Sequence, residues 1–139
     1  MNSALKRRQS DGGFSLIELL AVMIIIGLLA SIAIPLYLDQ KKKSHDAETK
    51  SDVNAVANSM VSYLANETAL PSMTVAGSAV MVDGKQFANL SPGVILGPLV
   101  GTNSTDWCVD ATQPQGDRAK VKGYKFTSTE AKVEEGQCV

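Results

Sequence analysis

Apolar residues form one long run near the start of the chain, and beyond it they recur at helical spacing. The run extends from Phe14 to Leu38, 25 residues with a single charged side chain, Glu18. At a rise of 1.5 Å per residue, a helix of this length reaches about 37 Å, which is enough to cross a bilayer with some tilt. The pattern therefore predicts a transmembrane helix over residues 14–38.

From Asp39 onward the chain becomes polar but keeps the helical period. Apolar positions repeat at intervals of three and four residues and define one face of a helix: Val53, Val56, Ala57, Met60 and Leu64. Two acidic residues precede a lysine by four positions and add favourable pairs, Asp39 with Lys43 and Asp46 with Lys50. Residues 39–66 are thus predicted to continue the first helix as an amphipathic segment, whose apolar face covers a C-terminal domain.

Residues 67–139 show short apolar runs separated by turn signals, the pattern of a small β-rich head. Ser78–Val82 and Lys85–Leu90 flank Asp83-Gly84, a strong signal for a two-residue hairpin turn. Val94–Leu96 is a short apolar run between glycines. Further strands are expected at Trp107–Asp110 and Lys120–Thr127, and a last strand or extended tail carries Cys138. The predicted fold class is α+β, with one long N-terminal helix packed on a small antiparallel sheet.

The cysteine count changes the picture of the head. A domain of about 70 residues buries a small hydrophobic core and usually needs additional stabilisation, such as a disulfide. Cys108 and Cys138 are the only cysteines, and in an exported chain they most simply form one disulfide. Two buried free thiols are the alternative.

Composition and charge exclude several functions. Aromatic residues make up 5% of the chain, too few for a large aromatic-lined pocket, and the net charge of −1 does not indicate a general nucleic-acid binder. No catalytic pattern stands out, so we expect no enzymatic activity and no cofactor. His45, Glu48 and Asp52 share a helical row whose side chains are of metal-ligating types, but we interpret them as a solvated charged face and expect no metal.

Basic residues lie on both sides of the apolar run. Lys6, Arg7 and Arg8 precede it and lysines at positions 41–43 follow it, so charge alone leaves the topology open. The cysteines favour an oxidising exterior for the head, which places the N-terminus in the cytoplasm. An ordinary signal peptide cut after Ala33 is an alternative that Glu18 disfavours.

The segment from Lys6 to Leu38 resembles the N-terminus of type IV prepilins. A basic leader ends in Gly13, Phe14 follows, Glu18 is the fifth residue after the junction, and Pro35 lies about two-thirds along the apolar run. The resemblance implies the type IV pilin fold, removal of residues 1–13 by a prepilin peptidase, and N-methylation of the new terminus at Phe14.

The same resemblance implies a function. The chain is expected to wait in the cytoplasmic membrane and then join a helical homo-oligomeric filament, the type IV pilus, at the cell surface. An assembly platform with its ATPase would add it, and the pilus would serve adhesion, motility or DNA uptake. The alternatives are a pseudopilin of a type II secretion or competence system, and a membrane-anchored binding module that does not polymerise. The cysteine pair favours a pilin.

Three residues of the apolar run are candidates for a role in assembly. Glu18 fits a helix capping box with Ser15, and the resemblance adds a second role as partner of the Phe14 amine of a neighbouring subunit. Gly27 and Pro35 mark a weak section of helix, which the resemblance implies loosens on assembly; a plain kinked span is the alternative.

One basic strip is a candidate contact surface of the head. Arg118, Lys120 and Lys122 would share one face of the strand expected at 120–127, inside the loop closed by the two cysteines. Such a strip could contact DNA, anionic glycans or a host surface. We favour the simpler interpretation, an edge strand that its lysines keep soluble.

Overall fold

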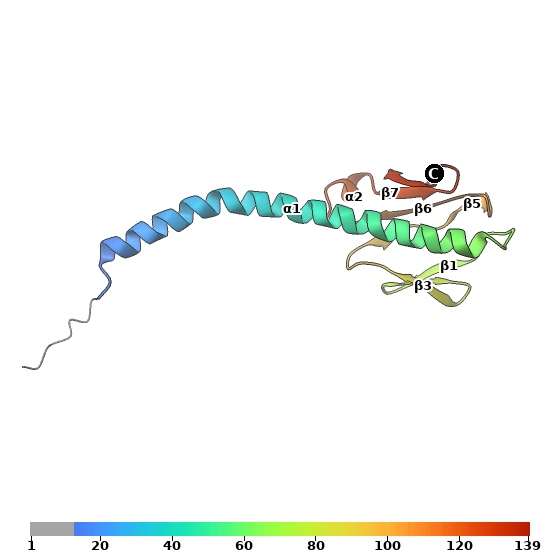
Figure 1. Ribbon diagram of the computed structural model, residues 1–139, viewed down its shortest axis with the longest axis horizontal. Helices are drawn as coiled ribbons and strands as arrows, with labels where there is room; N and C mark the ends of the chain where they lie inside the picture. The colour runs from blue at the N-terminus through green and yellow to red at the C-terminus, as the bar shows by residue number, and fades with distance from the viewer. Residues whose placement is uncertain (1–12) are drawn as a thin grey trace, which may run out of the picture. The chain divides into compact units, whose positions relative to one another are not determined.

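The computed structural model describes residues 13–139, beginning with helix α1 (Leu16–Leu64), which spans 49 residues (Figure 1). The described chain divides into two units, with the boundary between Tyr37 and Leu38. In the first unit, the large apolar side chains from Phe14 onward are exposed to an extent of about half or more. In the second unit, a helical segment and small antiparallel sheets share a core, as the α+β prediction requires.

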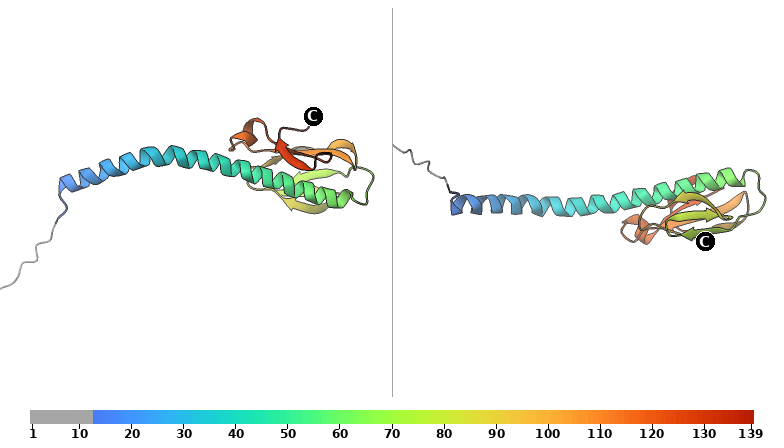
Figure 2. Two further views of the ribbon diagram at one scale, coloured as in Figure 1. Left: turned by 45° about the horizontal axis from the view of Figure 1, so that its top comes forward. Right: turned by 90° about the horizontal axis from the view of Figure 1, so that it is seen from below.

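The helical part of the second unit buries the face that the sequence indicated. All five apolar positions predicted from their spacing are at most 5% exposed, and three polar residues on the same face are buried with them: Asp46, Thr49 and Asp52. Figure 2 shows this part of α1 lying along the sheets in both views. This part of α1 therefore forms one side of the core.

Two sheets cover the helix, where the sequence predicted one. Three strands form the first, in the order β1-β2-β3: β1 (Met73–Ala76), β2 (Ala79–Val82) and β3 (Lys85–Asn89). Five strands form the second: β4 (Ile95–Leu96), β5 (Val100–Asn103), β6 (Asp106–Thr112), β7 (Tyr124–Thr127) and β8 (Lys132–Glu135). Its order is β4-β6-β7-β8, with β5 also paired to β6, and every pairing is antiparallel.

The predicted hairpin at Asp83-Gly84 is confirmed. Both residues have positive φ, 47° and 79°, as a two-residue turn of type I′ requires. The Asp83 carboxylate accepts a hydrogen bond from the Tyr63 hydroxyl at 2.6 Å and another from the Ser72 backbone N–H at 3.1 Å. This hydrogen bond from the hydroxyl raises the pKa of Tyr63 and ties the turn to the helix.

Strand β6 alternates between the core and the outer face of the second sheet. Trp107, Val109 and Ala111 are buried in the core, where the Trp107 ring stacks on Phe126 at 5.5 Å. Cys108 alternates with them and forms the predicted disulfide with Cys138, across a sequence separation of 30. Cys138 lies in the tail beyond β8, so the disulfide helps to attach the C-terminal tail to the sheet.

Candidate functional site

The junction between Gly13 and Phe14 lies outside helical structure. Residues 13–15 have no regular conformation and α1 begins at Leu16. The Phe14 side chain is 89% exposed. The basic leader residues Lys6, Arg7 and Arg8 lie outside the described part of the chain, so the structure bears only on the C-terminal side of the expected cleavage site.

The predicted capping box is present at the start of α1. The Ser15 hydroxyl accepts hydrogen bonds from the backbone N–H groups of Ile17, at 3.2 Å, and Glu18, at 3.4 Å. In return the Ser15 N–H donates to Oε2 of Glu18 at 2.9 Å. Within residues 13–139 the other carboxylate oxygen, Oε1, accepts no hydrogen bond, so capping leaves half of this exposed group available to a further partner.

The apolar run that follows has no cover in the described structure. Its most apolar 18-residue window has a mean hydropathy of 2.8 and no buried residue, which by length and composition suits a membrane-crossing helix. A side chain added at Gly27 would meet nothing within 4 Å, and the Ser31 hydroxyl donates to the Leu28 carbonyl of its own helix at 2.7 Å. Pro35 lies inside α1. A stripe this large and apolar requires lipid or other protein around it.

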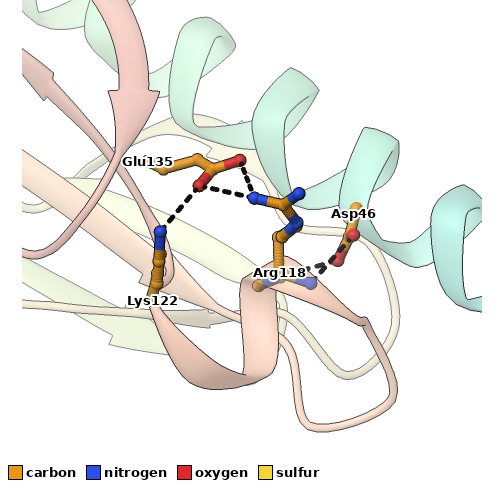
Figure 3. A network of polar contacts seen from close by, with 5 residues as sticks. Asp46, Arg118, Lys122 and Glu135 are labelled. Carbon is orange, nitrogen blue, oxygen red and sulfur yellow. Dashed lines mark hydrogen bonds and ion pairs between the residues drawn. The ribbon is translucent and has the colours of Figure 1, made fainter.

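Asp46 takes a different role from the one predicted. Instead of pairing with Lys50, its carboxylate accepts hydrogen bonds from the backbone N–H groups of Arg118, at 3.0 Å, and Ala119, at 2.9 Å (Figure 3). These N–H groups open the short helix α2 (Arg118–Val121). Asp46 is 7% exposed, so a buried carboxylate of α1 fixes α2 from 72 residues away. The predicted pair of Asp39 with Lys43 is confirmed at 2.8 Å.

The strand predicted at 120–127 is correct only from Tyr124 onward, and this changes the basic strip. Arg118 and Lys120 belong to α2, and Lys122 caps its C-terminal end. Arg118 donates to both carboxylate oxygens of Glu135 at 3.0 and 3.1 Å, and Lys122 reaches the same group at 3.4 Å. The three residues therefore do not form one face of a strand, because they lie in α2 and at its C-terminal end. Two of them, Arg118 and Lys122, pair with Glu135.

The three residues of the other predicted row, His45, Glu48 and Asp52, also do not act as one group. His45 Nδ1 lies 3.1 Å from Glu48, but Asp52 is buried and accepts from Ser91, through the backbone N–H at 2.6 Å and the hydroxyl at 3.2 Å. No group of three His, Cys, Asp or Glu side chains suited to a metal ion occurs among residues 13–139. Asp52 thus holds the loop after β3, as Asp46 holds α2.

Asp110 is a further buried carboxylate that the sequence did not single out. It lies two residues after Cys108 on β6, is 9% exposed, and lies close against Gly97. Burial raises its pKa, an effect that the backbone N–H of Cys138 opposes by donating to the carboxylate. This contact and the disulfide attach the C-terminal tail to the same strand.

Comparison with known proteins assigns the N-terminal segment. Residues 8–34 match the family model for the prokaryotic N-terminal methylation motif. The chain is 36% identical over 67 residues to type II secretion system core protein G of Aeromonas hydrophila, which covers 48% of this chain and 46% of that protein. It is 38% identical over 55 residues to the type IV major pilin protein PilA of Myxococcus xanthus, covering 40% and 25%.

A longer match extends into the head. The chain is 29% identical over 118 residues to the fimbrial protein EcpB of Eikenella corrodens, covering 80% of this chain and 74% of that protein. The chain spans about half the length of the secretion proteins it matches. No solved structure gives a significant match. The motif, the fold and these relatives make the chain similar to type IV pilins and to type II secretion core proteins, with an N-terminal methylation motif.

Proposed function

We propose that this chain is a structural subunit of a type IV pilus, with a mechanical rather than a catalytic role. The observation that carries the proposal is the uncovered apolar helix directly behind the Gly13–Phe14 junction. The core of the head includes residues of α1 from Val53 onward but none of residues 14–38, so the head does not need this apolar segment for burial. A surface of that kind suits a subunit that is held first by lipid and then by copies of itself.

The proposed sequence of events begins in the membrane. The chain is anchored through residues 14–38, with its N-terminus on the cytoplasmic side. A prepilin peptidase removes residues 1–13 and methylates the amine of Phe14, and an assembly platform driven by an ATPase then moves the subunit into the filament. There the free oxygen of Glu18 neutralises the Phe14 amine of an adjoining subunit, while Gly27 and Pro35 allow the helix to loosen.

A pseudopilin of a secretion system is the second candidate, favoured by the match to core protein G. Two observations support the pilin instead. The match to a fimbrial protein covers 80% of the chain and includes most of the head, whereas the match to core protein G covers 48%. The tail beyond β8 is also fastened by a disulfide, which suits a surface exposed outside the cell.

The experiment compares filaments from cells that produce the wild-type chain, a Gly13→Ser variant and a Gly12→Ser control. Sheared surface material is imaged by electron microscopy with antibodies against the head, and its N-terminus is determined by mass spectrometry. We expect labelled filaments whose subunits begin at methylated Phe14, in the wild type and the control. Gly13→Ser should leave uncut chain in the membrane. Short structures confined to the envelope would favour the pseudopilin, and a mature chain beginning at Met1 or Ile34 would overturn the proposal.

A further inference from the structure

Most of the positive charge that follows Phe14 is gathered in two segments of the sequence. Ten lysines and arginines follow Phe14, and seven of them lie in residues 38–50 and 114–122, together with four carboxylates. The remaining positions after Phe14 carry three cations and nine carboxylates. Although the chain as a whole is slightly acidic, these two segments are therefore rich in cations, whereas the rest of the chain after Phe14 is acidic.

The structure brings these two segments together. A groove of about 170 Å³ is lined by residues that include Lys41, Lys42 and Gln115. A second groove of about 430 Å³ shares Lys42 and Gln115 and extends to Lys120 and Val121. Asp117 also lies near enough to contribute to the raised pKa of Lys43, whose main cause is the hydrogen bond to Asp39. The two grooves form one continuous surface across α1 and α2.

The cations of this surface differ in whether they are already neutralised. Lys43 pairs with Asp39, and Arg118 and Lys122 pair with Glu135. Within the described residues, Lys41, Lys42 and Lys120 have no ion-pair partner. Beside Lys120, Val121 presents an apolar side chain that is 76% exposed. Free ammonium groups around an exposed apolar side chain are the features of a surface that meets lipid headgroups.

We propose that Lys41, Lys42 and Lys120 bind anionic phospholipid headgroups while the chain is anchored in the membrane. The apolar run ends at Leu38, and Lys41 follows three residues later, less than one helical turn, so the lysines of α1 lie at headgroup level. Lys120 would reach the same surface through α2, which Asp46 fixes to α1. The proposal rests on the membrane-anchored stage of the proposed function, and polymerisation is not needed for it.

The test uses the full chain in vesicles of phosphatidylcholine, with or without anionic phosphatidylglycerol. Lysines are acetylated with acetic anhydride, a neutral reagent, and rates at each position are measured by peptide mass spectrometry. Lys120 is the decisive position, because it is far from the end of the apolar run in the sequence. Anchoring of the apolar run does not by itself bring this lysine to the membrane surface. Lys85, on β3, serves as the internal reference. Each lysine that lies near an anionic membrane surface strengthens binding to that surface about fivefold. The acetylation rate of Lys120, relative to that of Lys85, should therefore fall about fivefold when phosphatidylglycerol is present.

Two variants make the result specific. Lys41→Gln combined with Lys42→Gln should return the Lys120 rate to its value in phosphatidylcholine, whereas Lys125→Gln combined with Lys132→Gln removes equal charge elsewhere and should leave the protection intact. Salt at 1 M should abolish it, because the Debye length falls to about 3 Å.

Three outcomes would overturn the proposal. The first is an equal Lys120 rate in both kinds of vesicle, and the second is protection that survives loss of Lys41 and Lys42. The third is equal protection by free glycerol phosphate with phosphatidylcholine vesicles, which would indicate a site for a soluble anion. Filament imaging is independent of this measurement, so failure of the pilus assignment would be recognised separately.

Discussion

Replacing Asp46 with asparagine should destabilise the head far more than the same change elsewhere on α1. Both carboxylate oxygens of Asp46 accept backbone N–H groups, at 3.0 and 2.9 Å. An asparagine has only one accepting oxygen, so its NH2 group must face a donor, either Arg118 N–H or Ala119 N–H. The residue cannot retreat, because it is 7% exposed and lies close against Gly116.

The magnitude follows from those two contacts. A hydrogen bond to a charged group contributes about 1.5–3 kcal/mol, and a buried donor left without a partner costs about 1–3 kcal/mol. Asp46→Asn weakens one bond by removing the charge and replaces the other with an opposed pair of donors, so we expect a loss of about 2–3 kcal/mol. The folded unit of residues 38–139 has about 100 residues, and for a unit of this size the loss lowers the melting temperature by about 10–15 °C.

The assay follows thermal unfolding of the full chain in detergent through the fluorescence of Trp107, the single tryptophan, which is buried in the head. Asp39→Asn is the matched control, because it makes the same change on the same helix to a carboxylate that only meets exposed Lys43. The control should melt with the wild type. If Asp46→Asn also melts within 2 °C of the wild type, the view that Asp46 holds α2 in place is wrong.

Three further predictions concern the other polar groups. Replacing Cys108 and Cys138 with alanine should cost about 3.5 kcal/mol by the chain-entropy estimate for a separation of 30, measured by denaturant unfolding; an unchanged midpoint would contradict it. Burial raises the pKa of Asp110 in the folded head, so ionisation of this carboxyl group opposes folding at pH values above its raised pKa. Asp110→Asn should therefore raise the melting temperature at pH 7. Below pH 3.8, where the carboxyl group is protonated in both the folded and the unfolded chain, the variant should no longer be more stable than the wild type. Glu18→Leu should leave membrane insertion and cleavage intact but abolish filaments, whereas normal filament yield would leave only the capping role.

The sequence predicted the helix and its buried face because both depend on local spacing. The periodicity that placed Val53, Val56 and Met60 on one side was sufficient, and the Asp83-Gly84 turn needed only its own two residues. The apolar run and its capping box are equally local. These features are set by neighbours within a few positions, so no knowledge of the remaining fold was required.

Contacts between distant residues were not predictable in the same way. Asp46 had a lysine four residues away and was assigned to it, but the N–H groups of α2 offered a buried site with two donors. A signal was available, since Asp46 continues the row of Thr49, Val53 and Val56 and thus lies on the buried face. Strands β1 and β5 were missed because each is four residues long and largely exposed, with little apolar alternation to reveal it.

The head buries its own apolar side chains, whereas the apolar segment needs lipid or other subunits to cover them. This difference gives Glu18 a particular importance in assembly. Seventeen large apolar side chains between Phe14 and Leu38 are exposed, and covering them is worth about 25–50 kcal/mol at 1.5–3 kcal/mol each. A bilayer and a bundle of identical helices supply this burial about equally, since lipid chains are as apolar as leucine. Transfer from membrane to filament is therefore nearly neutral for the apolar side chains. The free energy of this transfer then depends mainly on the few polar groups of the segment. Among the described residues of the segment, Glu18 is the one that carries a charge and has a carboxylate oxygen without a hydrogen bond.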